Sequence, residues 1–261
     1  KFQMPLFDEL YREMLAIKSR KYHHRKLKME AVPPPLPFTN VIHVEHLGFY
    51  YPGVSDEVLI DVSFSIPKGS FVGIMGPSGA GKTTFVDILL GLFVPTRGRI
   101  TVDGVDIRHA LRAWQANIAY VPQSIYLTDA TIRENVALGE SPDEIDDARV
   151  HKALAMAELD AFVNAQPKGI ETMVGERGVK LSGGQRQRIG IARALYQQPE
   201  VLILDEATSA LDTETEKSIT DTILKFKGQI TIIAIAHRTS TLKECDFRVR
   251  FERGRVETLR D

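Results

Sequence analysis

The stretch FVGIMGPSGAGKTTFVDILL, residues 71–90, decides the fold of this chain. Its first five residues form an apolar run that is typical of a buried parallel strand, and the residues from Thr83 onward favour a helix. Between them, Gly76–Thr83 matches the pattern G-x-x-x-x-G-K-[ST], in which glycines let the backbone wrap around phosphate oxygens. Lys82 adds a cation at the phosphates, and the Thr83 hydroxyl can bind Mg²⁺. The stretch therefore predicts a nucleotide phosphate site between a strand and a helix.

The composition limits the class of protein. The chain has 261 residues, of which 43% are hydrophobic, enough for one large domain or one domain with a sizeable subdomain. The net charge of −1 gives no support to a nucleic-acid binder that works by bulk positive charge. Cys245 is the single cysteine, so an intrachain disulfide is impossible and a reducing compartment is favoured. Apolar runs such as Ile88–Val94 are far shorter than the roughly 18 residues of a membrane span.

The first forty residues differ from the rest. Residues 5–30 combine helix formers with a loose helical period, and Lys18–Lys28 holds six basic residues and no acidic one. Three consecutive prolines within Ala31–Pro37 end any helix and favour an extended linker. The basic run fits either a solvated helix face or a segment that anionic lipid attracts beneath a membrane. Because the sequence begins at Lys1 rather than Met, we expect a fragment of a longer polypeptide, with a separate subunit as the alternative.

The middle of the chain changes from strands to helices. Val41–Phe49 and Val58–Ile66 alternate apolar and polar residues, which predicts an antiparallel sheet with one wet face. Arg99–Ile107 contains Asp-Gly between strand-like runs, which indicates a hairpin. The span from Asp129 to Gly184 is predicted to be mostly helical. Within it, the Ser-x-x-Glu pattern at Ser141 predicts a capping box with Pro142 as the first helical residue.

Two further buried strands are predicted near the C-terminus, at Pro199–Ala207 and Ile230–Arg238, with a helix between them. Alternation of strands and helices predicts an α/β core with a parallel sheet. Asp205 emerges at the end of the first of these strands, where a P-loop NTPase places its Mg²⁺ carboxylate. Glu206 follows directly, and a carboxylate there can accept a proton from an attacking water.

Several short motifs together resemble the ATP-binding cassette (ABC) family. They are LSGGQ at Leu181–Gln185, the phosphate loop, and LILDEATSALD at Leu202–Asp212. IAYVPQ resembles the Q-loop of the family, SALD its D-loop, IAHR its switch histidine, and FYYP its aromatic A-loop. The resemblance covers about residues 40–257. It implies an α/β fold with a RecA-like P-loop NTPase core, an antiparallel β-subdomain and an inserted α-helical subdomain at about residues 126–186. The implied domains are a membrane-proximal helix and linker at 1–37 and a nucleotide-binding domain at 38–261.

The same resemblance assigns the site. It implies ATP and Mg²⁺ as cofactors, with Thr83, Gln123 and Asp205 serving the metal. Glu206 would be the general base, assisted in catalysis by Lys82, Gln123 and His237. Tyr51, rather than Tyr50, would stack on adenine. The other nucleotide contacts would come from Gly76, Ser78, Gly79, Ala80, Gly81, Lys82, Thr83, Thr84, Ser182, Gly183, Gly184, Gln185 and Asp212. The last five would act across a head-to-tail dimer, on the ATP held by a second, identical cassette.

The segment ETMVGERG, Glu171–Gly178, resembles an element of ABC exporters that touches the membrane domains. Contact through Glu176 and through the Gln123 region would place the chain on the cytoplasmic face of the inner or plasma membrane. Tyr120–Gly139 looks most like flippases of lipid-linked oligosaccharides and polysaccharides. The resemblance therefore implies an ATPase that powers transport and binds no nucleic acid.

Two alternatives and two departures accompany this resemblance. A soluble ABC ATPase acting on ribosomes or DNA is one alternative, and a non-hydrolysing nucleotide switch is the other. The switch is disfavoured because Glu206 and His237 are both present. Ala80 replaces the serine that is common in the loop, and Asp246–Glu257 has one apolar and one basic face, which predicts an exposed edge strand. Neither the cargo nor the identity of the partner cassette follows from the sequence.

Overall fold

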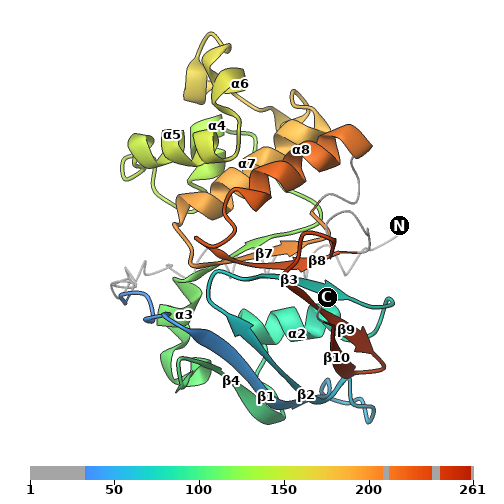
Figure 1. Cartoon of the computed structure of the whole chain (residues 1–261). Coiled ribbons are helices and arrows are strands. Elements are labelled where there is room, and N and C mark those ends of the chain that lie inside the picture. Colours follow the sequence, from blue (N-terminus) through green and yellow to red (C-terminus); the bar gives the residue numbers. More distant parts are fainter. Residues whose placement is uncertain (1–32, 208–211, 237–241, 260–261) are drawn as a thin grey trace, which may run out of the picture. The chain divides into compact units, whose positions relative to one another are not determined.

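The computed structural model describes residues 33–207, 212–236 and 242–259 (Figure 1). The predicted N-terminal helix with its basic run, and the predicted switch residue His237, lie outside the described residues. Within them the alternating pattern of strands and helices forms two sheets.

The larger sheet has six strands in the order β10-β9-β3-β8-β7-β6. All neighbouring strands are parallel except β9 and β10, which confirms the predicted α/β core. Its apolar runs are buried on both faces, as a parallel sheet requires. The strands are β3 (Phe71–Met75), β6 (Ile118–Val121), β7 (Val201–Asp205), β8 (Thr231–Ile235), β9 (Phe247–Glu252) and β10 (Arg255–Leu259).

The smaller sheet has four antiparallel strands in the order β2-β1-β4-β5. The alternation of buried and exposed residues along β2 confirms the predicted wet face. The Asp-Gly turn at Asp103 joins β4 to β5 as the predicted hairpin. The strands are β1 (Val41–Phe49), β2 (Leu59–Pro67), β4 (Arg97–Val102) and β5 (Val105–Asp106).

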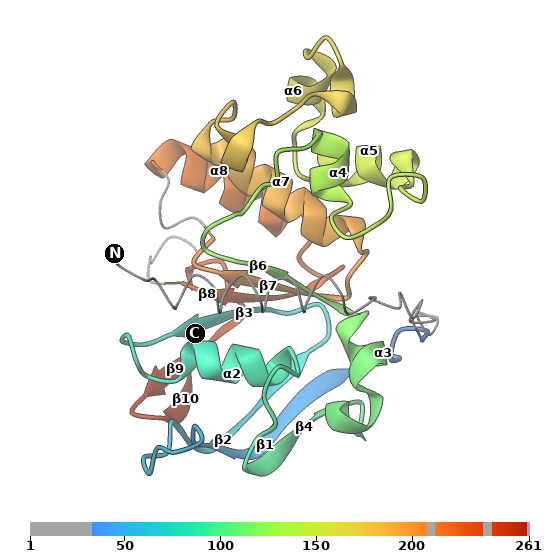
Figure 2. The same cartoon turned by 180° about the vertical axis from the view of Figure 1, so that it is seen from behind.

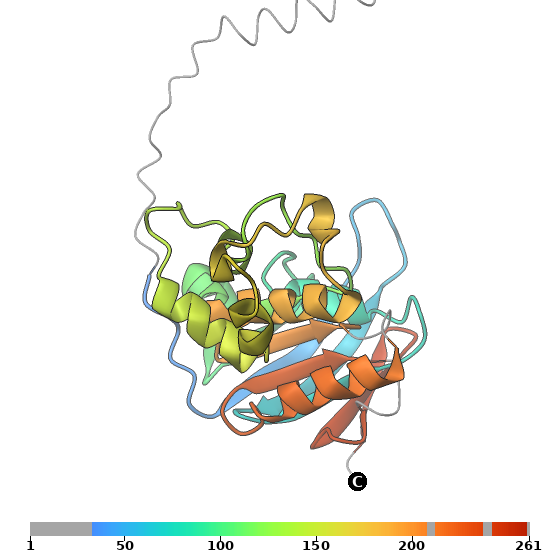
Figure 3. The ribbon, with the colours of Figure 1, turned by 90° about the horizontal axis from the view of Figure 1, so that it is seen from above.

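Helices cover both faces of the larger sheet (Figures 1 and 2). One apolar core joins the sheet to α4, α5, α7 and α8, and a second joins it to α2 and the antiparallel sheet. From above, α5 (yellow-green) and α8 (orange) lie over opposite ends of the sheet (Figure 3). The helices are α2 (Lys82–Leu89), α3 (Leu111–Gln115), α4 (Ile132–Val136), α5 (Asp147–Met156), α6 (Asp160–Asn164), α7 (Gly183–Tyr196) and α8 (Thr213–Leu224), with 3₁₀ turns at Ile107–Ala110, Gly169–Glu171 and Glu176–Gly178.

The predicted helix start at Ser141 is wrong. Residues 142–144 form a turn, and α5 begins at Asp147, where the Asp146 carboxylate accepts a hydrogen bond of 3.1 Å from the Arg149 backbone N–H. The guanidinium of Arg133 binds the carbonyls of Pro142 and Ile145, so these groups are satisfied outside a helix. The wider expectation of a mostly helical span is also wrong, because loops separate the short helices α4, α5 and α6.

The C-terminal segment is a hairpin rather than a single edge strand. Arg253 and Gly254 both have positive φ, 48° and 75°, which is the geometry of a tight two-residue hairpin turn. This turn reverses the chain, so β9 lies between β3 and β10, and β10 forms the edge. The predicted apolar face of β9 is nevertheless correct, because Phe247, Val249 and Phe251 are buried.

The parallel strands bring the predicted site together. The carboxyl ends of neighbouring parallel strands lie at the same edge of a sheet. The phosphate loop follows β3, Gln123 comes two residues after β6, and Asp205 ends β7. These three segments are distant in sequence but share one edge of the six-stranded sheet.

Candidate functional site

Glycine conformation shapes the phosphate loop. Gly76 has φ 142°, and a Cβ there would lie 2.1 Å from the carbonyl oxygen of Phe251. Gly81 has φ 101°, and its Cβ would lie 2.7 Å from the Leu59 side chain. A Cβ on Gly79 would instead meet open space. The first and last of these glycines are therefore required by close packing, and the loop backbone near Gly79 is accessible to a ligand.

The side chain of Lys82 is held by the backbone of the phosphate loop. Its side chain is buried, and its Nζ donates to the carbonyls of Gly76 and Pro77 at 2.8 and 2.9 Å. Burial lowers the pKa of Lys82, and the charges of Glu206 and Asp205 oppose this shift. A cation in this position faces the carboxylates at the end of β7, which is the arrangement needed to hold a phosphate together with a metal ion.

Glu206 adopts an unusual backbone conformation. Its φ is 46°, in the left-handed region that residues other than glycine, asparagine and aspartate rarely occupy. Its backbone N–H donates to the Ile235 carbonyl, and its Oε2 accepts a hydrogen bond of 2.8 Å from the Gln123 amide. Backbone strain of this kind is often found at functional sites. The structure thus places two predicted residues, Gln123 and Glu206, in direct contact.

Asp205 has a partner that the sequence prediction missed. The Tyr120 hydroxyl donates to Asp205 Oδ2 at 2.7 Å. Burial, followed by this hydrogen bond and the nearby negative charge, raises the pKa of Tyr120 well above its usual value. Burial and the charge of Asp205 also raise the pKa of Asp87, on α2. The contact depends on the pairing of β6 with β7, and no single sequence motif specifies that pairing.

Tyr51 lies beside the phosphate loop. Its hydroxyl is 3.0 Å from the Thr84 hydroxyl, and its ring meets the rings of Phe49 and Phe93 edge to face. Tyr50 is 47% exposed and has no ring partner among the described residues. The choice of Tyr51 over Tyr50 and the stacking on adenine both stay predictions.

The signature segment starts a helix. The Ser182 hydroxyl accepts from the Gln185 N–H, and the Gln185 side chain accepts from the Ser182 N–H, which forms a capping box at the start of α7. A Cβ on Gly184 would lie 2.7 Å from the Thr215 side chain on α8. Asp212 caps α8 by accepting from the Thr215 N–H at 3.0 Å. The first turns of α7 and α8 therefore lie against each other.

A groove of about 190 Å³ separates the Gln123 segment from α7. Its lining residues are Gln123, Ser124, Ile125, Gly183, Arg186, Gln187 and Ala207. A Cβ on Gly190 would lie 2.3 Å from Ile125 Cδ1, so this glycine lets the segment approach the helix closely. The groove therefore extends from Gln123, which contacts Glu206, to the N-terminus of α7.

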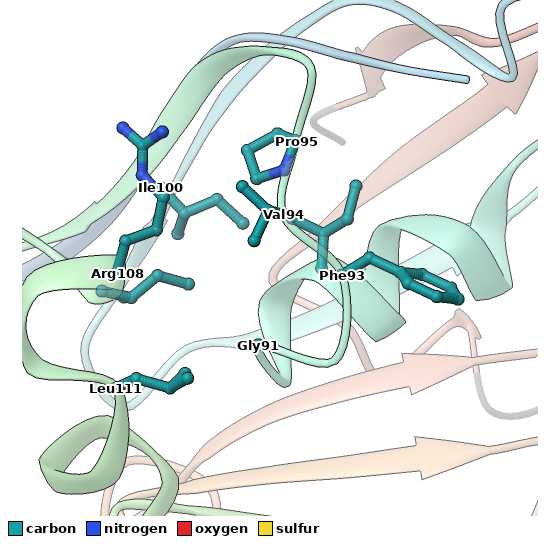
Figure 4. Close-up of a pocket in the computed structure, with 9 residues that line it drawn as sticks. Gly91, Phe93, Val94, Pro95, Ile100, Arg108 and Leu111 are labelled. Atoms are coloured by element: carbon teal, nitrogen blue, oxygen red, sulfur yellow. The ribbon is translucent and has the colours of Figure 1, made fainter. Parts of the chain in front are cut away.

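An apolar pocket of about 130 Å³ lies beyond the end of α2 (Figure 4). Arg108 is the charged residue in its lining, and the carboxylate of Asp106 binds its guanidinium. The pocket therefore suits an apolar side chain rather than a phosphate. Val94 in its lining is 68% exposed, and the neighbouring Leu92 is 63% exposed. The lining residues are Ile88, Gly91, Phe93, Val94, Pro95, Ile100, Ile107, Arg108 and Leu111.

The residues present fit a nucleotide with a hard cation. Mg²⁺ prefers oxygen ligands and is usually held by one or two protein side chains together with substrate phosphates and water. The Thr83 hydroxyl is exposed beside the loop, and Asp205 supplies a partly buried carboxylate. Helix α2 begins directly after the loop, so its N-terminus also favours an anion. The donor set thus suits a metal-bound nucleotide.

Comparisons with known proteins agree with this site. Residues 59–209 match the family model described as ABC transporter. An ATP-dependent lipid A-core flippase of Cupriavidus metallidurans is 45% identical over 214 residues, covering 81% of this chain and 36% of the flippase. The mitochondrial potassium channel ATP-binding subunit of Xenopus tropicalis is 44% identical over 218 residues, covering 82% of this chain and 31% of that protein. The chain thus spans about a third of the length of these curated relatives.

A solved bacterial Atm1-family ABC exporter with ATP bound has the same fold. It superposes with a TM-score of 0.77 at 40% identity, over 87% of this chain and 40% of the exporter chain. In the part of the chain that the structure describes, no helix is both long and apolar enough to cross a membrane. The family model covers more than half of the chain, and exporters recur among the relatives and structures that match. This chain therefore belongs to the ABC transporter family, and its ATP-binding domain is of the exporter type.

Proposed function

We propose that this chain binds and hydrolyses ATP to power an exporter that moves a lipid-linked glycan or a similar amphipathic lipid across a membrane. The observation that carries the proposal is the convergence of Lys82, Asp205 and Glu206 at one edge of the sheet. The similarity to a lipid A-core flippase supports the class of cargo. The same matches favour an exporter over a soluble ABC ATPase acting on ribosomes or DNA.

The nucleotide would be held by the phosphate loop and by Tyr51. Backbone N–H groups around Gly79 would surround the phosphates, with Ser78, Ala80, Thr83 and Thr84 beside them. Lys82 would leave its bonds to the loop carbonyls and donate to the phosphates instead. Thr83, Asp205 and Gln123 would hold Mg²⁺, which when bound neutralises phosphate charge.

Glu206 would act as the general base. Its carboxylate would accept the proton of the attacking water while the water oxygen bonds to the γ-phosphorus. Gln123 already binds one of its carboxylate oxygens, so this amide would orient the base. His237, outside the described residues, would contact the γ-phosphate and orient Glu206.

The signature segment would act on a second copy of the chain. Ser182, Gly183 and Gly184 lie at the N-terminus of α7, where backbone N–H groups favour an anion. In a head-to-tail homodimer they would cover the ATP of the partner, with Gln185 and Asp212 at the same interface. ATP would then close the dimer, and hydrolysis would release it.

Membrane domains would dock on the surface near Gln123 and Glu176. Two exposed apolar side chains support this proposal, Tyr126 at 66% and Val179 at 74% exposure. The pocket near Val94 gives a third apolar feature that could accept a side chain of a membrane-domain loop (Figure 4). The chain would then lie on the cytoplasmic face of the membrane. Residues 1–37 would form the membrane-proximal helix and linker, residues 38–261 the nucleotide-binding domain, and residues 126–186 its helical subdomain.

Mixing two inactive variants tests the shared site. Lys82→Ala removes the phosphate cation, and Ser182→Arg blocks the signature segment, so each homodimer should be inactive. A mixed dimer keeps one complete site, so equal mixing should restore about a quarter of the wild-type ATPase rate if subunits pair at random. The wild-type rate should also rise faster than linearly with protein concentration.

Two results would contradict the proposal. Absence of Mg²⁺-dependent ATP hydrolysis by the wild type would remove the enzymatic function. Wild-type hydrolysis that is linear in concentration, with no recovery on mixing although Glu206→Gln dimerises with ATP, would show that each chain holds a complete site. Dimer formation by Glu206→Gln with ATP, followed by light scattering, would separate this result from weak pairing.

A further inference from the structure

Tyr120 touches the carboxylate at the centre of the proposed metal site, yet no motif includes it as a functional residue. Its hydroxyl donates to Asp205 Oδ2 at 2.7 Å. Tyr120 lies on β6 and Asp205 ends the neighbouring parallel strand β7. The ring is 37% exposed, so it is not explained as a core residue.

The strand geometry explains how the two side chains meet. Successive side chains of a strand point to opposite faces of the sheet. Ala119 and Val121 belong to the core on the α7 side, so Tyr120 points toward the α2 side. In β7, Ile203 belongs to the core on the α2 side, and Asp205 shares its face. Tyr120 and Asp205 are therefore directed to the same side of the sheet as the phosphate loop and α2.

Asp205 interacts with one positive and one negative side chain, those of Lys82 and Asp87. The attraction between Lys82 and Asp205 opposes the fall in the pKa of Lys82, and the charge of Asp205 helps to raise the pKa of Asp87. A cation and an anion thus lie within electrostatic reach of one carboxylate. A hydroxyl donor can hold a carboxylate in one orientation without adding a charge to the site.

We propose that Tyr120 is a positioning residue that holds the Asp205 carboxylate in the orientation needed for Mg²⁺ and its bound water. The proposal rests on the proposed ATPase function. Tyr120 would hold Oδ2, which leaves Oδ1 for the metal ion or its bound water. Hydrogen bonds from neighbours to metal-binding groups commonly change metal affinity by about 10- to 100-fold when removed. The present contact is a single neutral hydrogen bond, so the lower end of that range applies.

Tyr120→Phe tests the proposal because it removes the hydroxyl and keeps the ring. Binding of a fluorescent ATP analogue is titrated with Mg²⁺ for the wild type and the variant, and ATPase rates are measured over the same Mg²⁺ range. We expect the half-saturating Mg²⁺ concentration to rise about tenfold. At saturating Mg²⁺ the ATPase rate should recover, and binding measured with a chelator present should be unchanged.

Tyr50→Phe is the matched control, because this tyrosine is 47% exposed and its hydroxyl has no hydrogen-bond partner among the described residues. It should leave the Mg²⁺ dependence unchanged. A Mg²⁺ dependence in Tyr120→Phe within about twofold of the wild type would overturn the proposal. Equal loss of nucleotide affinity with and without Mg²⁺, together with a lower melting temperature, would show a merely structural role and would also overturn it. If the wild type itself neither bound nor hydrolysed ATP, the proposed function would fail instead.

Discussion

Replacing Tyr51 separates two ways in which it could serve the nucleotide. Tyr51→Phe removes the hydroxyl that lies 3.0 Å from the Thr84 hydroxyl and keeps the ring. Tyr51→Ala removes the ring as well. If the ring stacks on adenine, ATP affinity should follow the ring and not the hydroxyl. Tyr51→Trp, which restores a flat aromatic surface, should then bind ATP about as well as the wild type.

The structure sets the expected magnitudes. Stacking of a base on an aromatic ring contributes about 1–3 kcal/mol, so Tyr51→Ala should raise the Kd for ATP roughly 5- to 150-fold. The ring also contacts Phe49 and Phe93, with centroids 5.1 and 5.7 Å away. Two such pairs contribute about 1–3 kcal/mol to stability, so Tyr51→Ala should unfold at a lower temperature but remain folded at 25 °C. Tyr51→Phe loses one hydrogen bond, worth about 1 kcal/mol of stability, and should keep its affinity within about threefold.

Equilibrium titration with a fluorescent ATP analogue, at a temperature where circular dichroism shows every variant folded, measures these affinities. Tyr50→Ala is the control, because Tyr50 is the exposed neighbour in the same segment. Wild-type affinity in Tyr51→Ala would refute stacking. Equal losses in Tyr51→Phe and Tyr51→Ala would show that the hydroxyl, acting through Thr84, carries the effect instead. A loss in Tyr50→Ala alone would mean that the choice between the two tyrosines is wrong.

Glu206→Gln tests the proposed general base, and Asp103→Asn tests the hydrogen bonds that hold the segment from Thr39 to Val41. Glu206→Gln keeps the shape of the side chain that Gln123 contacts, so ATP affinity should stay within about twofold. Turnover should fall at least about 100-fold, because the amide cannot accept the proton of the attacking water. Wild-type turnover of this variant in a single-cycle assay would exclude Glu206 as the base. Burial by itself would raise the pKa of Asp103, but hydrogen bonds from Thr39, Val41 and Asn40 outweigh it and lower the pKa to about 2. Because the folded pKa lies below the ordinary value of 3.8, this stabilisation is complete above about pH 4 and is lost as the pH falls toward about 2. Asp103→Asn should therefore lower the free energy of unfolding by roughly 1 kcal/mol at neutral pH, after discounting for solvent screening, and by less at acidic pH. Urea unfolding at both pH values measures the two differences, and a difference that does not shrink with acid would contradict the account.

The sequence was sufficient to expect the predicted site residues at one edge of the sheet because its signals are local. The phosphate loop, the Asp205–Glu206 pair and the Gln123 motif each follow an apolar strand, and parallel strands must end together. The contact between the side chains of Tyr51 and Thr84, which are 33 residues apart, was not predicted. Local sequence patterns do not specify contacts between strands. The hydrogen bond between Tyr120 and Asp205 was therefore not predicted.

The two wrong predictions of secondary structure have different origins. The pattern at Ser141 is a genuine capping signal, but Arg133 takes the carbonyls of Pro142 and Ile145 from outside the segment. The strand expected through Asp246–Glu257 breaks because Arg253 and Gly254 accept positive φ, and the new strand β10 then covers β9. In the first place a contact with a distant residue overrides a local preference, and in the second a local turn was not predicted.

The signature segment shows why one motif can satisfy structure and function together. Ser182 and Gln185 cap α7 with each other's backbone, so the end of the helix is stable without a ligand. Gly184 is needed within the chain, because any Cβ there would meet Thr215 on α8. A small residue at this position therefore keeps the two helix starts close, and it also leaves backbone N–H groups uncovered by side chains. The packing of the two helices thus leaves backbone N–H groups at the start of α7 uncovered, as the binding of an anion from a partner chain would require. This makes the segment suitable for a site that only a second copy completes.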